Sequence, residues 1–228
     1  MPGEEQQLRW AIIDQPAEDT PRIASADWLQ EHGRDLQAQF VREQVAQAQT
    51  GQTVATPEIH DLWHNRGVQD VYFDAMPVPV GTFWTGLPNG QPHWRAPRYG
   101  APERPHFTVT RGFVSAIAGR YQDLRPVFDR IFGEHPVTEV DISGFLYFDY
   151  GPVHFGFVSQ EMYQSRPSQY PVGLDDYLIP DDLWAFGAAV HGWAAVRDSQ
   201  TMELWKVLNA TVLAFGQEQG RRLREKLE

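Results

Sequence analysis

The sequence predicts a mixed α+β protein: a helical N-terminal subdomain, a small sheet packed by helices, and a long C-terminal helix. Three observations predict it. Apolar residues recur at helical spacing near the N-terminus, apolar runs rich in β-branched and aromatic residues follow residue 106, and helical spacing returns at the C-terminus. We therefore expect a helical subdomain over residues 1–67, a Pro/aromatic-rich loop or arm over 68–106, and a mixed α/β subdomain over 107–228.

The N-terminal subdomain is expected to begin with two helices. The first covers about residues 5–14. The stretch TPRIASADWLQEHG then specifies the second, which Asp19 or Thr20 is expected to cap. Pro21 would take its first position, where a missing N–H costs nothing, and Gly33 would supply a left-handed C-cap.

Asp35 is expected to cap a third helix that pairs with the second as a hairpin, and residues 57–66 are expected to form a short fourth helix. Asp27 lies among apolar neighbours on the second helix, and Arg42 lies on the third. Because a buried carboxylate without a partner is costly, we predict an Asp27–Arg42 pair that holds the hairpin together. The alternative role for Asp27 is a ligand or a catalytic acid.

The second half of the chain alternates strands and helices. A strand is predicted over 107–118, an amphipathic helix over 121–133 and another strand over 137–143. The run FLYFDYGPVHFGFV is predicted to form two buried strands separated by Gly151 and Pro152. The last helix is expected to start near residue 199 and to run to the C-terminus.

Composition excludes several classes of function. The chain of 228 residues has no cysteine, which rules out disulfide scaffolds, cysteine-based zinc sites and thiol catalysis. Its formal net charge of -11 disfavours nucleic acid as a partner. The N-terminal residues lack the pattern of a signal peptide, and no apolar run reaches the roughly 20 residues of a membrane span, so we expect a cytoplasmic protein with no membrane contact.

Two groups of side chains are candidates for metal binding or catalysis. His60 and His64 are four residues apart on a predicted helix, which places two imidazoles on one face. The Glu that follows the first His in the H-E-x-x-H motif of zinc proteases is absent, since Asp61 stands there. The alternative is that His60 and His64 are ordinary surface histidines and bind no metal. Four carboxylates also cluster in one predicted loop, where they could bind a cation or cap a helix: Asp175, Asp176, Asp181 and Asp182.

Motifs for nucleotide binding and nucleophilic catalysis are absent from the sequence: there is no P-loop, no G-x-G-x-x-G and no G-x-S-x-G. We therefore assign no catalytic residue and expect no cofactor.

The arm is the leading candidate for a contact surface. Residues 76–105 contain seven prolines and four glycines, which no helix or central strand tolerates. Aromatic residues alternate there with arginines, the residue types of protein-binding hot spots. The candidate partner-binding residues are Trp84, Trp94, Arg95, Arg98 and Tyr99. The alternative is an arm folded back on the sheet, with its tryptophans in the core.

The N-terminal stretch resembles the motif of the repeat-companion domain family, which is expanded in planctomycetes and some myxobacteria. The similarity covers about 40 residues. The matching residues are Pro16, Asp19, Pro21, Arg22, Ala26, Asp27, Trp28, Leu29, Glu31, Gly33, Phe40, Arg42 and Gln44. RGFVSAI and HPVTEVDIS look like the segment that leads into leucine-rich repeats in many members, and LNATVLAFGQEQGRRL looks like a recurring C-terminal helix. The repeats themselves are missing from this sequence.

This resemblance implies a modular, non-catalytic bacterial protein of the kind often found beside interaction repeats. We therefore expect a cytoplasmic protein-interaction or adaptor module that binds a protein partner. Two alternatives stay open. One is a small hydrolase or metal-dependent enzyme with a site in the groove between the helical part and the sheet. The other is a structural subunit of a larger assembly.

Overall fold

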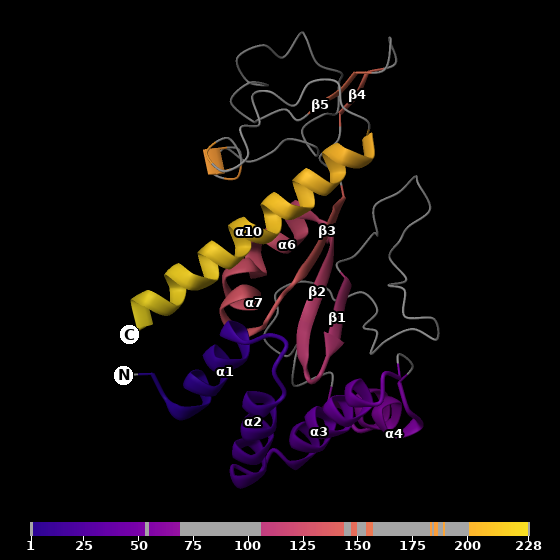
Figure 1. Ribbon diagram of the computed structural model, residues 1–228, viewed down its shortest axis with the longest axis vertical. Helices are drawn as coiled ribbons and strands as arrows, with labels where there is room; N and C mark the ends of the chain where they lie inside the picture. The colour runs from indigo at the N-terminus through magenta and orange to yellow at the C-terminus, as the bar shows by residue number, and fades with distance from the viewer. Residues whose placement is uncertain are drawn as a thin grey trace.

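The computed structural model gives a mixed α+β protein with a small sheet and a long C-terminal helix (Figure 1), as the sequence predicts. It describes residues 2–52, 55–68, 106–143, 147–149, 154–156, 183, 185–186, 189 and 201–227. The helices α1 to α4 gather at the end of the sheet where β1 turns into β2, and α6, α7 and α10 cover one of its faces.

The N-terminal helices follow the predicted order. They are α1 (Glu4–Asp14), α2 (Thr20–Glu31), α3 (Asp35–Gln49) and α4 (Pro57–His60), which continues into a π-helical turn, η1 (Asp61–Asn65). The predicted helix over 57–66 is therefore only partly α-helical, because its second half widens into a π-turn.

The ends of α2 and α3 show which capping predictions were right. Gly33 adopts the left-handed conformation, with φ of 76°. Asp19 occupies the N-cap of α2, but its side chain makes no capping hydrogen bond. Asp35 lies in the first turn of α3, where its charge favours the helix dipole, and Arg34 is the N-cap residue.

Among the described residues, the main sheet has three strands in the order β1-β2-β3. They are β1 (His106–Thr110), β2 (Phe113–Arg120) and β3 (Glu139–Ser143). β1 and β2 are antiparallel with a bulge between Thr108 and Val109, and β2 and β3 are parallel.

The prediction of one strand over 107–118 was wrong, because this segment is a hairpin. Thr110 pairs with Phe113, so Arg111 and Gly112 form a two-residue turn. Their φ angles are 52° and 82°, and positive φ at both positions is what a type I′ turn requires.

The connection from β2 to β3 is a helical crossover, as parallel strands require. It consists of α6 (Tyr121–Leu124), a short 3-10 turn, η2 (Arg125–Val127), and α7 (Phe128–Glu134). The predicted continuous helix over 121–133 is broken at η2, which contains Pro126, since proline removes an amide donor and clashes with the preceding turn.

The C-terminal part contains a second hairpin and a long helix. β4 (Tyr147–Asp149) and β5 (His154–Gly156) pair antiparallel, in agreement with the prediction of two strands around Gly151 and Pro152. The helix α10 (Thr201–Leu227) lies along α7 and β3 (Figure 1). Asn209 of α10 accepts a hydrogen bond from the Ile142 amide at 2.9 Å.

Close packing of α10 on α7 depends on two glycines. A Cβ on Gly216 would overlap the ring of Phe132, and one on Gly220 would lie 2.5 Å from the Phe132 carbonyl oxygen. Glycine at these positions lets the two helices approach closely.

In the part of the chain that the structure describes, two clusters of buried residues form the core. The larger one fills the space around the sheet and includes Phe40, Trp63, Ile117, Phe128 and Val212. The smaller one lies among α1, α2 and α3 and consists of Ile12, Ala26, Leu29, Ala38, Val41, Val45 and Phe113. Phe113 comes from β2, so the sheet contributes directly to the core of the helical subdomain.

Candidate functional site

The predicted partner-binding residues and the acidic loop fall outside the described residues. This holds for Trp84, Trp94, Arg95, Arg98 and Tyr99, and for Asp175, Asp176, Asp181 and Asp182. The structure does describe the two residues that bound the arm. Val68 and Phe107 are each 1% exposed, and both belong to the larger core cluster.

Asp27 and Arg42 form the predicted ion pair, with Arg42 Nη2 2.7 Å from Asp27 Oδ1. The reasoning from burial was wrong, however, since the Asp27 side chain is 61% exposed. An exposed pair of this kind contributes little to stability.

His60 and His64 do lie side by side. Their ring centroids are 4.5 Å apart, and both residues are exposed. Partial burial and the neighbouring His60 lower the pKa of His64. Among the residues that the structure describes, no group of three or more metal-binding side chains is found.

The first polar cluster that sequence reasoning missed surrounds the β1–β2 turn. We call it the turn socket, and it consists of Arg22 on α2 with Val41 and Gln44 on α3. Gln44 Oε1 accepts a hydrogen bond from the Gly112 amide at 2.7 Å, and Gln44 Nε2 donates to the Val109 carbonyl at 3.4 Å. One buried amide side chain thus satisfies two backbone groups of the hairpin.

The other two residues of the turn socket, Val41 and Arg22, pack tightly against the hairpin. A Cβ on Gly112 would lie 2.5 Å from Cγ2 of Val41. Phe113 enters the smaller core cluster, and the guanidinium of Arg22 lies 5.9 Å from the centre of its ring. Arg22 also donates to the Pro16 carbonyl at 2.8 Å.

Arg111, the first residue of the β1–β2 turn, binds the loop between α1 and α2. Its Nη1 donates to the Ala17 carbonyl at 2.7 Å and lies 3.4 Å from Asp19 Oδ1. Gln49 Nε2 donates to Asp19 Oδ2 at 3.2 Å. Asp19 therefore joins the hairpin turn and α3 instead of capping its own helix.

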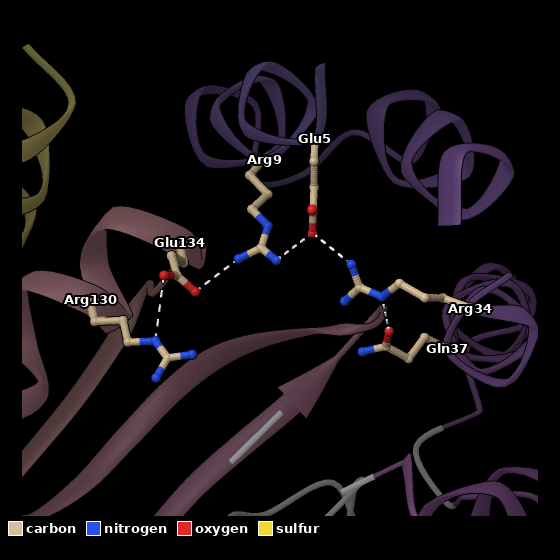
Figure 2. Close-up of polar contacts among 6 residues, drawn as sticks. All are labelled: Glu5, Arg9, Arg34, Gln37, Arg130 and Glu134. Carbon is tan, nitrogen blue, oxygen red and sulfur yellow. Dashed lines mark hydrogen bonds and ion pairs between the residues drawn. The ribbon is translucent and has the colours of Figure 1, made fainter. Parts of the chain in front are cut away.

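The second cluster is a charged junction between the N-terminal helices and α7. Figure 2 shows its six residues: Glu5, Arg9, Arg34, Gln37, Arg130 and Glu134. Glu5 Oε1 accepts from Arg9 at 2.6 Å and from Arg34 at 2.8 Å. Arg9 Nη1 also donates to Glu134 Oε2 at 2.8 Å, and Arg130 Nε lies 3.4 Å from Glu134 Oε1.

This junction changes the pKa of Glu5 and that of a neighbouring histidine. Burial alone would raise the pKa of Glu5, but hydrogen bonds from Arg34 and Arg9 outweigh it and leave that pKa below its usual value. His135 follows α7 and is buried. Burial, reinforced by the charges of Arg9 and Arg130, lowers its pKa to about 3. His135 is therefore neutral at physiological pH, and its Nδ1 accepts from the Val114 amide at 3.4 Å.

The turn socket and the charged junction connect parts of the fold. In the turn socket the polar groups bind backbone groups, and in the charged junction they bind one another. Several residues of the N-terminal motif meet at the socket: Pro16, Asp19, Arg22 and Gln44. Local sequence patterns gave no signal for the charged junction, because Arg9 and Glu134 are 125 residues apart.

Comparisons with protein-family models, with curated proteins and with solved structures find no match to this chain. Among the helices that the structure describes, none has the length and apolar character needed to cross a membrane.

Proposed function

We propose that this chain is a cytoplasmic bacterial protein-interaction or adaptor module of the repeat-companion type, and that the arm over residues 68–106 supplies its partner contact. The observation that carries the proposal is how the arm is anchored. Val68 at one end and Phe107 just past the other are buried in the same core cluster. A segment rich in Trp, Tyr and Arg is thus tethered at both ends to a packed scaffold, as binding loops commonly are.

The scaffold itself supports this role. Phe107 belongs to β1, and the turn that follows β1 is held by Gln44. Side chains on rigid elements form more precise contacts than those on loose ones. Trp, Tyr and Arg also contribute most of the binding energy at protein interfaces.

The test is affinity purification of the tagged full-length protein from its native cell, followed by mass spectrometry of intact complexes. We expect one protein partner at fixed stoichiometry. Replacement of Trp94 and Tyr99 by Ala should remove it. A matched control replaces Ile23 and Leu227 by Ala, which removes two exposed large apolar side chains, and this variant should keep the partner.

A partner that survives the Trp94 and Tyr99 replacements would show that the arm is not the contact. A purified protein with no protein partner and a stoichiometric small molecule would contradict the adaptor proposal as a whole.

A further inference from the structure

The proposed function does not use the two neighbouring histidines of α4 and η1. His60 is the last residue of α4, and His64 lies in the π-turn η1. Their rings are inclined at 47°, with centroids 4.5 Å apart, and both side chains are exposed. Two imidazoles this close can bind one ion between them.

The segment that carries these histidines is firmly anchored, so the backbone positions of His60 and His64 are set before any ion binds. Ile59, Leu62 and Trp63 are at most 1% exposed. The Trp63 ring stacks on Phe40 with centroids 5.1 Å apart. Thr56 caps the start of α4 by accepting a hydrogen bond from the Ile59 amide. Because the backbone under the two histidines is already ordered by packing, only their side chains must be ordered on binding.

We propose that His60 and His64 form a two-imidazole surface site for a divalent transition-metal ion. Imidazole nitrogen is a preferred ligand of Zn²⁺, Ni²⁺ and Cu²⁺, whereas Mg²⁺ and Ca²⁺ prefer oxygen. The neighbouring carboxylate of Asp61 accepts a hydrogen bond from Asn65 at 2.9 Å. Two imidazoles leave the remaining coordination positions to water, so the site is open, unlike a closed structural zinc site.

This ligand set also predicts an order of affinities. Nitrogen sites generally bind Cu²⁺ more tightly than Ni²⁺ or Zn²⁺. Mg²⁺ at the same concentration should not compete. This selectivity separates an imidazole site from general attraction of cations to an acidic protein.

The experiment is a calorimetric titration of the untagged, metal-free full-length protein, once with NiCl₂ and once with CuCl₂. We expect one ion per chain. Replacing a residue that only supports a metal ligand weakens metal binding by about 10–100-fold. His60→Gln and His64→Gln each remove a ligand itself, so each should weaken binding by at least about tenfold. His32→Gln is the matched control, since His32 is exposed on a helix end and its ring stacks on Trp28 at 3.9 Å.

A second measurement needs no variant. Electron paramagnetic resonance of the Cu²⁺-loaded protein should show two equivalent imidazole nitrogens. Binding that persists in the His60→Gln/His64→Gln protein would overturn the proposal, and so would a spectrum with one imidazole or none. Loss of the protein partner in the earlier experiment would leave this result unaffected, because these histidines lie outside the arm.

Discussion

The turn socket and the charged junction both tie the N-terminal helices to the rest of the fold, but they use different chemistry. The socket uses a neutral amide, Gln44, which is 4% exposed. The junction uses ion pairs whose side chains are about a quarter to a third exposed, such as Arg9 at 24% and Glu5 at 33%. Buried neutral hydrogen bonds are costly to leave unmade, whereas partly exposed ion pairs are weakened by salt and acid.

This difference indicates separate roles. The socket should set the position of the hairpin under all conditions in which the protein folds. The junction should add stability that depends on ionic strength and pH. Three measurements can test this distinction, and a fourth tests the exposed Asp27–Arg42 pair for comparison.

The largest effect is expected for Gly112→Ala in the turn socket. The new Cβ would meet Val41, and alanine would have to adopt a φ of 82°. Left-handed strain and overpacking together should lower the free energy of unfolding by about 2–5 kcal/mol. Urea unfolding followed by circular dichroism measures this. A loss below about 1 kcal/mol would show that the turn can move away from α3. Gly51→Ala is a matched control, because Gly51 also has a positive φ of 71° but no atom would lie within 4 Å of its Cβ.

The second effect concerns pH and His135, beside the junction. Its pKa is about 3 in the folded protein, against an ordinary value of 6.5. Between these two pKa values the unfolded chain binds a proton at His135 that the folded chain does not bind. The contribution of His135 to the free energy of unfolding is therefore fully present above pH 6.5 and is lost as the pH falls towards 3. Between pH 7 and 4.5 this group should remove about 2–3 kcal/mol.

His135→Asn checks the assignment, since asparagine does not titrate and its side-chain oxygen can still accept from the Val114 amide. We expect the pH dependence between 7 and 4.5 to become shallower in this variant. An unchanged slope would assign the effect to other histidines, and His32→Asn serves as the control for an exposed one.

The third measurement compares the two regions directly. Gln44→Met leaves the Gly112 amide without its Gln44 acceptor, and we expect a loss of about 1–3 kcal/mol at any salt concentration. Arg9→Met leaves Glu5 with Arg34 and Glu134 with Arg130, and we expect about 1–2 kcal/mol at low salt. In 1 M NaCl, where the Debye length is about 3 Å, the Arg9→Met loss should shrink. Equal salt dependence in the two variants would remove the distinction between the regions.

The smallest effect is expected at the exposed Asp27–Arg42 pair. A double-mutant cycle with Asp27→Asn and Arg42→Gln should give a coupling free energy of about 0.2–1 kcal/mol. Binding of the protein partner should be unchanged. A coupling above 2 kcal/mol would restore the view that this pair holds the hairpin together.

Helix ends were the most predictable part of the fold, because proline and glycine restrict the backbone locally. Gly33 follows the end of α2 as expected, and Pro21 lies at the second position of α2, one residue later than expected. The turn at Arg111 and Gly112 was missed because it interrupts a run of β-forming residues and lacks the usual Asn-Gly or Asp-Gly signal. The break at η2 could have been read from Pro126, which stands inside an otherwise regular helical pattern.

Polar contacts were less predictable, because their partners are distant in sequence. The spacing of apolar residues does not distinguish Gln44 from exposed glutamines of the same helix, and its contacts lie 65 and 68 residues away. Asp27 and Arg42 were matched correctly because both lie on one helical hairpin. Their exposure was misjudged, since Asp27 lies beside apolar residues in sequence but points outwards from α2.

The contacts between α10 and β3 have a consequence for synthesis on the ribosome. Asn209 accepts from the Ile142 amide, and Gln217 donates to the Val137 carbonyl at 3.2 Å. These partners are 67 and 80 residues apart. At about 5–20 residues per second, roughly 3–16 s pass before these α10 residues are made. During that interval the Ile142 amide and the Val137 carbonyl lack the side-chain partners that α10 supplies in the folded protein, so this edge of the fold is completed only at the end of synthesis.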